Sequence, residues 1–374
     1  VAFLTQFING ISIGSMYAVY DFLENFCGVG FFPDGDKIPQ RDALDFGEID
    51  YIRRPRFRYR MYHNHPNWSR PFVHCVRLWP FEEWKKLIDW MRKKRLNVLV
   101  LFHDEGTYLW GDAIFSAFPE IKKSEENLAR FVMMPDYRTE LNKRIFQYAR
   151  ENGITICYNL MYSQVPDFFQ KEKPDLTYHN LWMECSGICA AQKECKEIMR
   201  KFWGEIIRTY EVDGSHLYII CPYQHEKPLC NNFATRAEPT LQAYEVLKDI
   251  DPESKIFVEN WCWTTDYHPE REWEDFKKLP EGIGVLNADL GTSPAGEGYE
   301  RYKSKDWLQW IFLTMEGTFP PSLMFHSIED IMFQAKQADI FGACGLLAFN
   351  IIANSNELLC NLIAELGWTT DLDK

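Results

Sequence analysis

Glu226 follows an apolar run that stops abruptly in polar residues, HLYIICPYQHE over 216–226. Such a run is typical of a buried strand whose last side chains reach one edge of a sheet. The same pattern recurs along the chain. The polar and aromatic side chains that follow the runs are His63, Asn64, His65, His103, Asp104, Glu105, Asn159, Tyr162, Tyr223, Gln224, His225, Glu226, Glu259, Asn260, Trp261, Trp263, Asn287, Asp289, Glu316, Asn350 and Asn354. Carboxyl groups therefore recur beside indole, phenol, imidazole and amide groups.

This combination meets the needs of glycosidic bond hydrolysis. One carboxylic acid protonates the leaving oxygen, and a second carboxylate acts as nucleophile or base. Glu226 is the first candidate for the general acid, and Glu316 and Asp289 compete to be the second carboxylate. Aromatic faces stack on sugar rings, while amide, imidazole and phenol groups bind hydroxyls. The side chains expected to bind the substrate are His63, Asn64, Asp104, Glu105, Tyr223, His225, Glu259, Trp261, Trp263 and Asn350. The residues leave open whether the sugar is neutral, N-acetylated or a uronic acid.

A metal-dependent hydrolase is the alternative enzyme class. His63 and His65 have the H-x-H spacing that puts two imidazoles on one face of an extended strand, where they could bind a metal ion together with His103 and Asp104. The later histidines His268 and His326 fall in predicted loops, so no clear further ligand follows the fifth or sixth strand. We therefore favour the glycosidase and expect no metal and no cofactor.

The elements that must position these residues alternate between strand-like and helix-like segments from residue 57 onward. The predicted strands are 57–63, 96–102, 154–160, 216–222, 255–261, 284–290, 307–315 and 345–352. The predicted helices are 81–95, 140–152, 192–210, 240–250, 270–279, 327–341 and 355–368. This alternation predicts an α/β fold of the (β/α)8 TIM barrel type, in which all the strand-end residues meet at one rim. A doubly wound open sheet is the alternative.

Residues 1–50 precede the predicted barrel and contain one helix, around 15–25, and one strand, 29–32. That is too little for an independent core. We expect residues 1–50 to be the remnant of a small α/β domain or an element docked on the barrel, and 51–374 to form the catalytic barrel. The first residues lack a basic region and a small-x-small cleavage site, so no signal peptide is predicted. No run approaches the roughly 18 apolar residues that a membrane span needs.

The charge and the cysteine content indicate which partners and which cellular compartment to expect. A net charge of −13 repels phosphate backbones, so we expect a glycoside or oligosaccharide substrate and no nucleic acid. Among the 11 cysteines, Cys185, Cys189 and Cys195 lie closest together, but no C-x-x-C pair accompanies them, so a zinc site is not favoured. Buried free thiols are the better interpretation, and they favour a reducing compartment such as the cytoplasm, or an anaerobic bacterial source. The oligomeric state is not predicted.

The chain contains, in order, the stretches MYAVYDFLENFCGVGFF, FRYRMYHNH, PFEEWKKLIDWMRKKRLNVLVLFHDEG, HLYIICPYQHEKP, IFVENWCW, GVLNADLG and NELLCNLIAELGW. Together these stretches resemble the alpha-N-acetylglucosaminidases of glycoside hydrolase family 89 over nearly the whole chain. The N-terminal part also resembles alpha-glucuronidases, whose barrel follows a similar small domain. The resemblance implies a retaining glycosidase with two catalytic Glu residues that acts on a terminal sugar.

The two glutamates of the family carry over unequally. The first ends the fourth strand after an Asn, and it corresponds to Glu226 with His225 in place of that Asn and the spacing off by one. The second stands in Pro-Glu-Gly near the C-terminus, where this chain reads AFNIIANSNE and has Asn350 near the Glu position. The nucleophile is then supplied by Glu316 or Asp289, or it is absent. Its absence would predict a carbohydrate-binding protein without catalysis.

Overall fold

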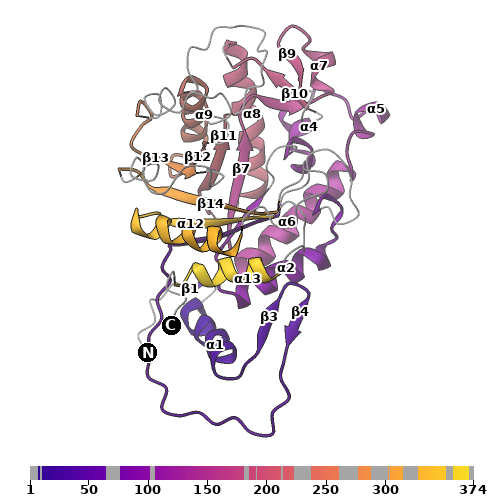
Figure 1. The fold of residues 1–374 in the computed structure, drawn as a ribbon. Helices are drawn as coiled ribbons and strands as arrows, with labels where there is room; N and C mark the ends of the chain where they lie inside the picture. The colour runs from indigo at the N-terminus through magenta and orange to yellow at the C-terminus, as the bar shows by residue number, and fades with distance from the viewer. Residues whose placement is uncertain are drawn as a thin grey trace.

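The computed structural model arranges eight parallel strands in a closed barrel (Figure 1). It describes residues 7–8, 11–64, 76–101, 106–180, 185–190, 192–211, 214–222, 237–260, 277–287, 302, 304–314, 327–350 and 357–369. The barrel strands are β5 (Tyr59–Asn64), β6 (Val98–Leu101), β7 (Thr155–Met161), β11 (Leu217–Cys221), β12 (Lys255–Glu259), β13 (Ile283–Asn287), β14 (Trp307–Thr314) and β15 (Gly345–Asn350). They pair in sequence order, and β15 closes the barrel on β5 with Asn350 opposite Asn64. The predicted barrel is confirmed, and the open sheet is wrong.

In the described part of the chain, six long helices pack around the barrel. They are α2 (Phe81–Lys93), α6 (Pro135–Glu151), α8 (Lys193–Tyr210), α9 (Ala237–Ile250), α12 (Ile328–Ile340) and α13 (Glu357–Leu366). In α2 the acidic side chains lie in the first turn and the basic ones in the last, which complements the helix macrodipole, and its apolar face is buried. The helix predicted over 270–279 falls mostly outside the described residues. No helix in the described part of the chain is both long and apolar enough to cross a membrane.

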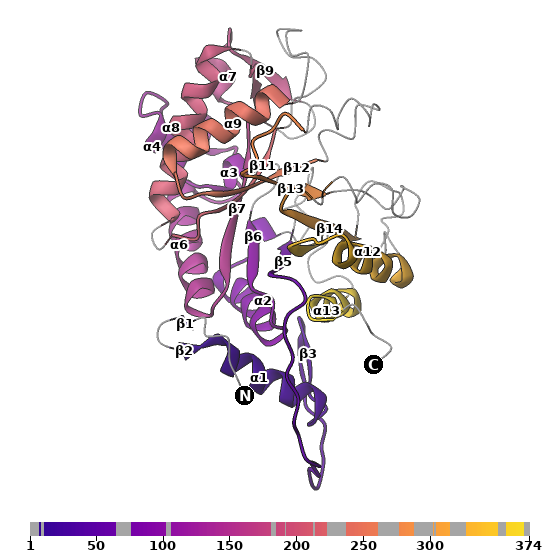
Figure 2. The ribbon, with the colours of Figure 1, turned by 90° about the vertical axis from the view of Figure 1, so that its left-hand side faces the viewer.

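Two insertions lengthen the connections that follow β6 and β7. The first holds the short helices α3 (Gly106–Leu109), α4 (Ala113–Ala117) and α5 (Glu125–Leu128). The second holds β8 (Gln164–Pro166), α7 (Phe169–Glu172), β9 (Thr177–Asn180) and β10 (Cys185–Ile188), whose strands form an antiparallel sheet in the order β8-β10-β9. Strands of three or four residues are too short for a periodic pattern, so the sequence did not predict them. Figures 1 and 2 show α7 and β9 at the end of the molecule opposite α1.

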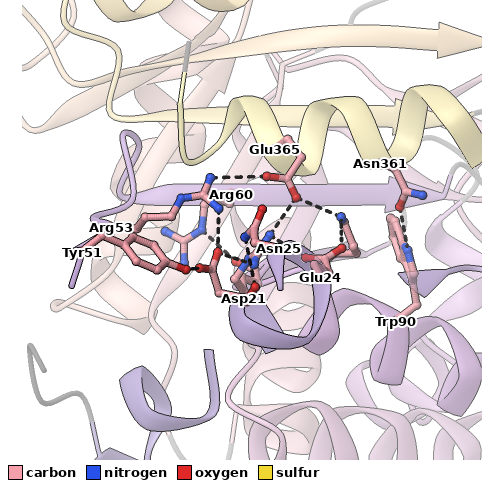
Figure 3. Close-up of polar contacts among 11 residues, drawn as sticks. Asp21, Glu24, Asn25, Tyr51, Arg53, Arg60, Trp90, Asn361 and Glu365 are labelled. Carbon is pink, nitrogen blue, oxygen red and sulfur yellow. Dashed lines mark hydrogen bonds and ion pairs between the residues drawn. The ribbon is translucent and has the colours of Figure 1, made fainter. Parts of the chain in front are cut away.

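The N-terminal segment docks at the amino end of the barrel strands. It consists of β1 (Phe7–Ile8), β2 (Ile11–Ser12), α1 (Ile13–Asn25), β3 (Gly30–Phe32) and β4 (Gly35–Lys37). Asp21 of α1 is the main anchor, because its carboxylate accepts hydrogen bonds from Arg95 at 2.8 Å and from Arg53 at 2.6 Å (Figure 3). Arg95 lies in the connection between α2 and β6 and is 1% exposed, so α1 supplies the charge that this buried guanidinium needs.

Helix α13 completes this network of charges. Glu365 pairs with Lys94 at 2.9 Å and with Arg95 at 2.7 Å, and Glu24 of α1 pairs with Lys94 at 2.6 Å (Figure 3). Burial alone would raise the pKa of Glu365, but the positive charges of Lys94 and Arg95 outweigh it and hold the pKa below its usual value. The network ties the N-terminal segment, the connection between α2 and β6, and the last helix together.

A chain of buried side-chain amides links three barrel strands to α12. The Asn260 amide donates to Asn287 Oδ1 at 2.9 Å, and Asn287 donates to Gln309 Oε1 at 3.0 Å. Gln309 then donates to Gln334 Oε1 at 3.2 Å and to the backbone carbonyl of Trp310 at 3.0 Å. All four amides are at most 4% exposed. Since each donates to the next, the chain fixes the carboxyl ends of β12 and β13 against β14 and α12.

We expect Asp21→Ala to lower the free energy of unfolding by about 3 kcal/mol, because it removes the carboxylate that faces two guanidinium groups, one of them buried. Urea unfolding followed by circular dichroism measures the loss. Asp36→Ala is the matched control, since Asp36 pairs with Lys93 at 2.6 Å on an exposed strand, and it should cost less than about 1 kcal/mol. Equal losses in the two variants would show that the buried network does not anchor the N-terminal segment.

We expect Gln309→Leu to lower the free energy of unfolding by about 2–3 kcal/mol, because it removes the acceptor of the Asn287 amide and the donor to Gln334 in a dry environment. The exposed Gln147, which donates to Glu151 at 2.8 Å, gives the control Gln147→Leu, with an expected change within about 0.5 kcal/mol. The same urea titration applies. A Gln309 variant as stable as the unchanged protein would contradict a structural role for the amide chain.

Candidate functional site

One apolar cluster draws on all eight barrel strands and on no helix, so it fills the barrel interior. Its buried members are Met61, Val98, Val100, Cys157, Leu217, Ile219, Phe257, Leu286, Leu308, Trp310, Leu347 and Phe349. Successive side chains of a strand point to opposite faces. A residue two positions beyond a member of the cluster on the same strand therefore also faces the interior.

Polar side chains replace apolar ones where the interior reaches the carboxyl ends of the strands. In (β/α)8 barrels the interior is built from layers of four side chains, each layer supplied by alternate strands. One such apolar layer is Met61, Cys157, Phe257 and Leu308. Two residues further along the same strands lie His63, Asn159, Glu259 and Trp310, each at most 2% exposed. We call these four residues the mouth layer. It combines an imidazole, an amide, a carboxyl group and an indole.

Aromatic contacts fix two members of the mouth layer. The ring of Phe349 meets His63 edge to face, with centroids 4.9 Å apart, and meets Trp310 in the same way at 4.7 Å. Another member of the mouth layer, Glu259, carries a carboxyl group and is completely buried. A carboxyl group is rarely kept in such a place without a specific interaction or a function.

Two amides at this end have buried atoms without a hydrogen-bond partner in the described part of the chain. They are both amide atoms of Asn64 and Oδ1 of Asn159. Native proteins rarely bury a polar atom in this way, and a ligand rich in hydroxyl or amide groups would supply the missing partners. Ser163, just beyond β7, is fully buried and has φ 67°. A non-glycine residue in the left-handed region is strained, and such strain concentrates at functional sites.

The described cysteines do not favour a thiol nucleophile. Burial raises the pKa of Cys195 and Cys360 to about 12 and raises the pKa of Cys157 well above its usual value. These thiols stay protonated and are weak nucleophiles. Cys189 is disulfide-bonded, so the prediction of a free thiol is wrong there, while Cys195 is free and buried as predicted.

Within the described residues, no group of three His, Cys, Asp or Glu side chains could hold a metal ion. His63 takes its place in the mouth layer, and its predicted companion His65 lies outside the described residues. The groups that the structure brings together are hydrogen-bonding and ring-stacking groups around one carboxyl. This set can bind a sugar and orient it for acid and base chemistry supplied from the loops.

The structure places four of the predicted site residues. His63 and Glu259 lie in the mouth layer, and Asn64 ends β5. Asn350 lies on the outer side of β15, where its amide donates to the Tyr62 hydroxyl at 3.4 Å and contacts Cys360 Sγ of α13 at 3.9 Å. The remaining predicted residues, Glu226, Glu316, Asp289, Asp104, Glu105, Tyr223, His225, Trp261 and Trp263, lie outside the described residues.

Two members of the mouth layer were not predicted to bind substrate. Asn159 precedes the last two residues of β7, and Trp310 stands in the middle of β14. Asn159 stands at the end of the third predicted strand but was not chosen as a binding residue, and Trp310 stands too far from the end of its strand to look like a strand-end residue. Both residues can be assigned to the interior because each lies two positions after a residue that faces inward, Cys157 or Leu308.

A hollow of about 1180 Å³ opens at the other end of the barrel. Its lining includes the first residues of five strands, Tyr59, Val98, Thr155, Leu217 and Lys255. In (β/α)8 enzymes the site is built at the carboxyl ends of the strands, and the amino ends serve stability. We therefore place the candidate site at the mouth layer and not in this hollow.

Known structures share the architecture. A family 89 glycoside hydrolase from Clostridium perfringens in complex with 2-acetamido-1,2-dideoxynojirmycin is similar with a TM-score of 0.72 and 14% identity, covering 97% of this chain and 43% of that chain. The same values apply to a form of that enzyme with two glutamates replaced by glutamine, in complex with its substrate GlcNAc-alpha-1,4-galactose. A beta-N-acetylhexosaminidase from Bacteroides fragilis is similar with a TM-score of 0.58 and 13% identity, covering 96% of this chain and 73% of that chain.

These likenesses establish the fold, and this chain spans less than half the length of the Clostridium perfringens enzyme. No curated protein matches the sequence. Residues 133–370, which make up more than half of the chain and hold six of the eight barrel strands, match the family described as the alpha-N-acetylglucosaminidase (NAGLU) tim-barrel domain. The resemblance seen in the sequence is thereby confirmed, and the chain belongs to the alpha-N-acetylglucosaminidase TIM-barrel family.

Proposed function

We propose that this chain is a glycoside hydrolase that releases a terminal, alpha-linked N-acetylglucosamine. The observation that carries the proposal is the mouth layer, where His63, Asn159, Glu259 and Trp310 give a buried, polar and aromatic floor at the catalytic end of the barrel. Family membership supports the reaction class. The substrate class is carried over from the Clostridium perfringens structures, one of which holds GlcNAc-alpha-1,4-galactose.

The chemistry requires two carboxyl groups beside the glycosidic bond. We assign the general acid to Glu226, which follows the carboxyl end of β11 in the sequence. It donates its proton to the glycosidic oxygen, and the aglycone leaves as an alcohol. Glu316, after β14, or Asp289, after β13, attacks the anomeric carbon and forms a glycosyl-enzyme. Water deprotonated by Glu226 then releases the sugar with retention of configuration.

Binding is assigned in part to the described residues. We expect His63, Asn64 and Glu259 to hold ring hydroxyls and the indole of Trp310 to line the same floor, because the four side chains are buried at this end of the barrel. Asn350 does not face the barrel interior, and its amide holds Tyr62 against α13. The further binding residues expected from the loops are Asp104, Glu105, Tyr223, His225, Trp261 and Trp263.

A non-catalytic carbohydrate-binding protein is the second candidate. The observation that favours it is Asn350, which stands near the position of the family's second Glu and carries an amide directed at Tyr62 and Cys360. An amide in that position can neither attack the anomeric carbon nor activate water. This candidate predicts sugar binding without turnover.

We expect the protein to hydrolyse a chromogenic alpha-N-acetylglucosaminide, and Glu226→Gln to lower kcat/KM by at least about 100-fold, because glutamine cannot donate the proton. Release of the chromophore measures the rate, with alpha-glucuronide and common hexosides tested in parallel. Glu253→Gln is the control, because Glu253 is exposed at the amino end of β12, and it should leave the rate unchanged.

The turnover assay also tests the role of Glu226, the substrate class and the non-catalytic candidate. Turnover that survives in the Glu226 variant would remove that residue from the acid role. Preference for the alpha-glucuronide would overturn the proposed substrate class. Binding of N-acetylglucosamine by calorimetry, with no turnover of any glycoside, would select the non-catalytic candidate.

A further inference from the structure

Asn159 differs from three buried amides on the outer face of the neighbouring barrel strands. On the outer face of the strands, the amides of Asn260, Asn287 and Gln309 all donate hydrogen bonds to other protein groups. Asn159 lies on the inner face of β7, is 2% exposed, and has its Oδ1 atom without a hydrogen-bond partner in the described part of the chain. Those three amides donate to protein groups, whereas the acceptor atom of Asn159 faces the barrel interior and receives no hydrogen bond from the described part of the chain.

The surroundings of Asn159 point to a ligand as the missing partner. A buried acceptor without a donor lowers the stability of the folded protein, so each such atom calls for an explanation, and a bound ligand that supplies the donor is one. The atom lies in the mouth layer beside Glu259, at the end of the barrel where (β/α)8 enzymes bind their substrates. Four residues further along, Ser163 holds its strained left-handed backbone, so the end of β7 carries two independent departures from ordinary packing.

We infer that Asn159 is a specificity-determining residue whose Oδ1 atom accepts a hydrogen bond from an N–H or O–H group of the bound terminal sugar. The inference rests on the proposed function and deepens it. The donor is either the acetamido N–H or a ring hydroxyl of N-acetylglucosamine, because these are the polar hydrogens that such a sugar offers.

The acceptor groups of the mouth layer also bear on which class of sugar binds. Asn159 Oδ1 can only accept hydrogen bonds, and the Glu259 carboxyl in the same layer adds further acceptor oxygens. These two acceptor groups suit a sugar that presents donors to them, while His63, Trp310 and the Asn159 Nδ2 group offer donors in the same layer. A uronic acid carboxylate directed at Asn159 Oδ1 and Glu259 would find no donor there, so this pair of groups disfavours a uronic acid in that orientation.

The test compares Asn159→Leu with the unchanged protein, because leucine matches the shape of asparagine and removes only its polarity. Calorimetry measures the affinity for 2-acetamido-1,2-dideoxynojirmycin and for 1-deoxynojirimycin, which lacks the acetamido group. We expect Asn159→Leu to bind the acetamido compound about 10- to 100-fold more weakly. A smaller loss for 1-deoxynojirimycin identifies the acetamido N–H as the donor, and an equal loss identifies a hydroxyl; both results support the inference.

Thermal unfolding separates ligand binding from a structural role. Leucine removes a buried acceptor that has no partner in the chain, so the Tm of Asn159→Leu should stay equal or rise. Asn142→Leu is the matched control: Asn142 is fully buried and its amide donates to the Leu109 carbonyl at 2.7 Å, so its Tm should fall while sugar affinity is kept. If Asn159→Leu does not fold, Asn159→Ala is measured in the same way.

Three outcomes would overturn the inference. The first is an affinity of Asn159→Leu within about twofold of the unchanged protein, which shows that the sugar does not use this amide. The second is a weaker affinity accompanied by a fall in Tm as large as that of Asn142→Leu, which shows a structural role. The third is an unchanged protein that binds neither compound, in which case the proposed function itself fails. Only the first two leave the proposed function standing.

Discussion

Closure of the parallel sheet imposes one constraint on every barrel strand, because alternate side chains must fill an interior that excludes water. Apolar residues such as Met61, Cys157 and Phe257 meet this constraint in the middle of the barrel. Two residues further along the same strands, the side chains that point inward are polar, and the surrounding strands keep them buried. The site therefore depends on barrel closure, since closure turns strand-end polar residues into a rigid, dry floor.

The two ends of the barrel bury polar groups for different purposes. At the amino end, Asp21 and Glu365 compensate Arg95, so the charges are paired within the chain and hold α1 and α13 in place. At the carboxyl end, Asn64 and Asn159 have buried atoms that the described residues do not satisfy. The paired charges at the amino end stabilise the fold, and we infer that a ligand completes the two amides at the carboxyl end.

The sequence predicted the barrel because buried parallel strands read as continuous apolar runs, and amphipathic helices separate them. The runs 96–102 and 216–222, for example, contain β6 and β11 within two residues at each end. It also located His63 and Glu259 at the carboxyl ends of their strands, because in both places an apolar run gives way to polar residues. The strands β8 to β10 were missed because three or four residues carry no measurable period.

Facing direction was the harder property to predict. Asn350 ends its strand as the prediction required, but it points to α13, whereas Asn159 and Trp310 lie within strands and point inward. Register and tilt decide which of two adjacent residues faces the interior, and these emerge only when all eight strands pair. A continuous apolar run on both faces gives no alternation from which to read that direction.

A crystal structure of the protein with 2-acetamido-1,2-dideoxynojirmycin tests the central claim most directly. We predict that the ring binds above the mouth layer, with a donor nitrogen or oxygen of the ligand within about 3 Å of Asn159 Oδ1 and with His63 and Glu259 in contact with the sugar. Density for the ligand in the hollow at the amino ends of the strands, or bound at the mouth without contact to any of these three residues, would contradict it.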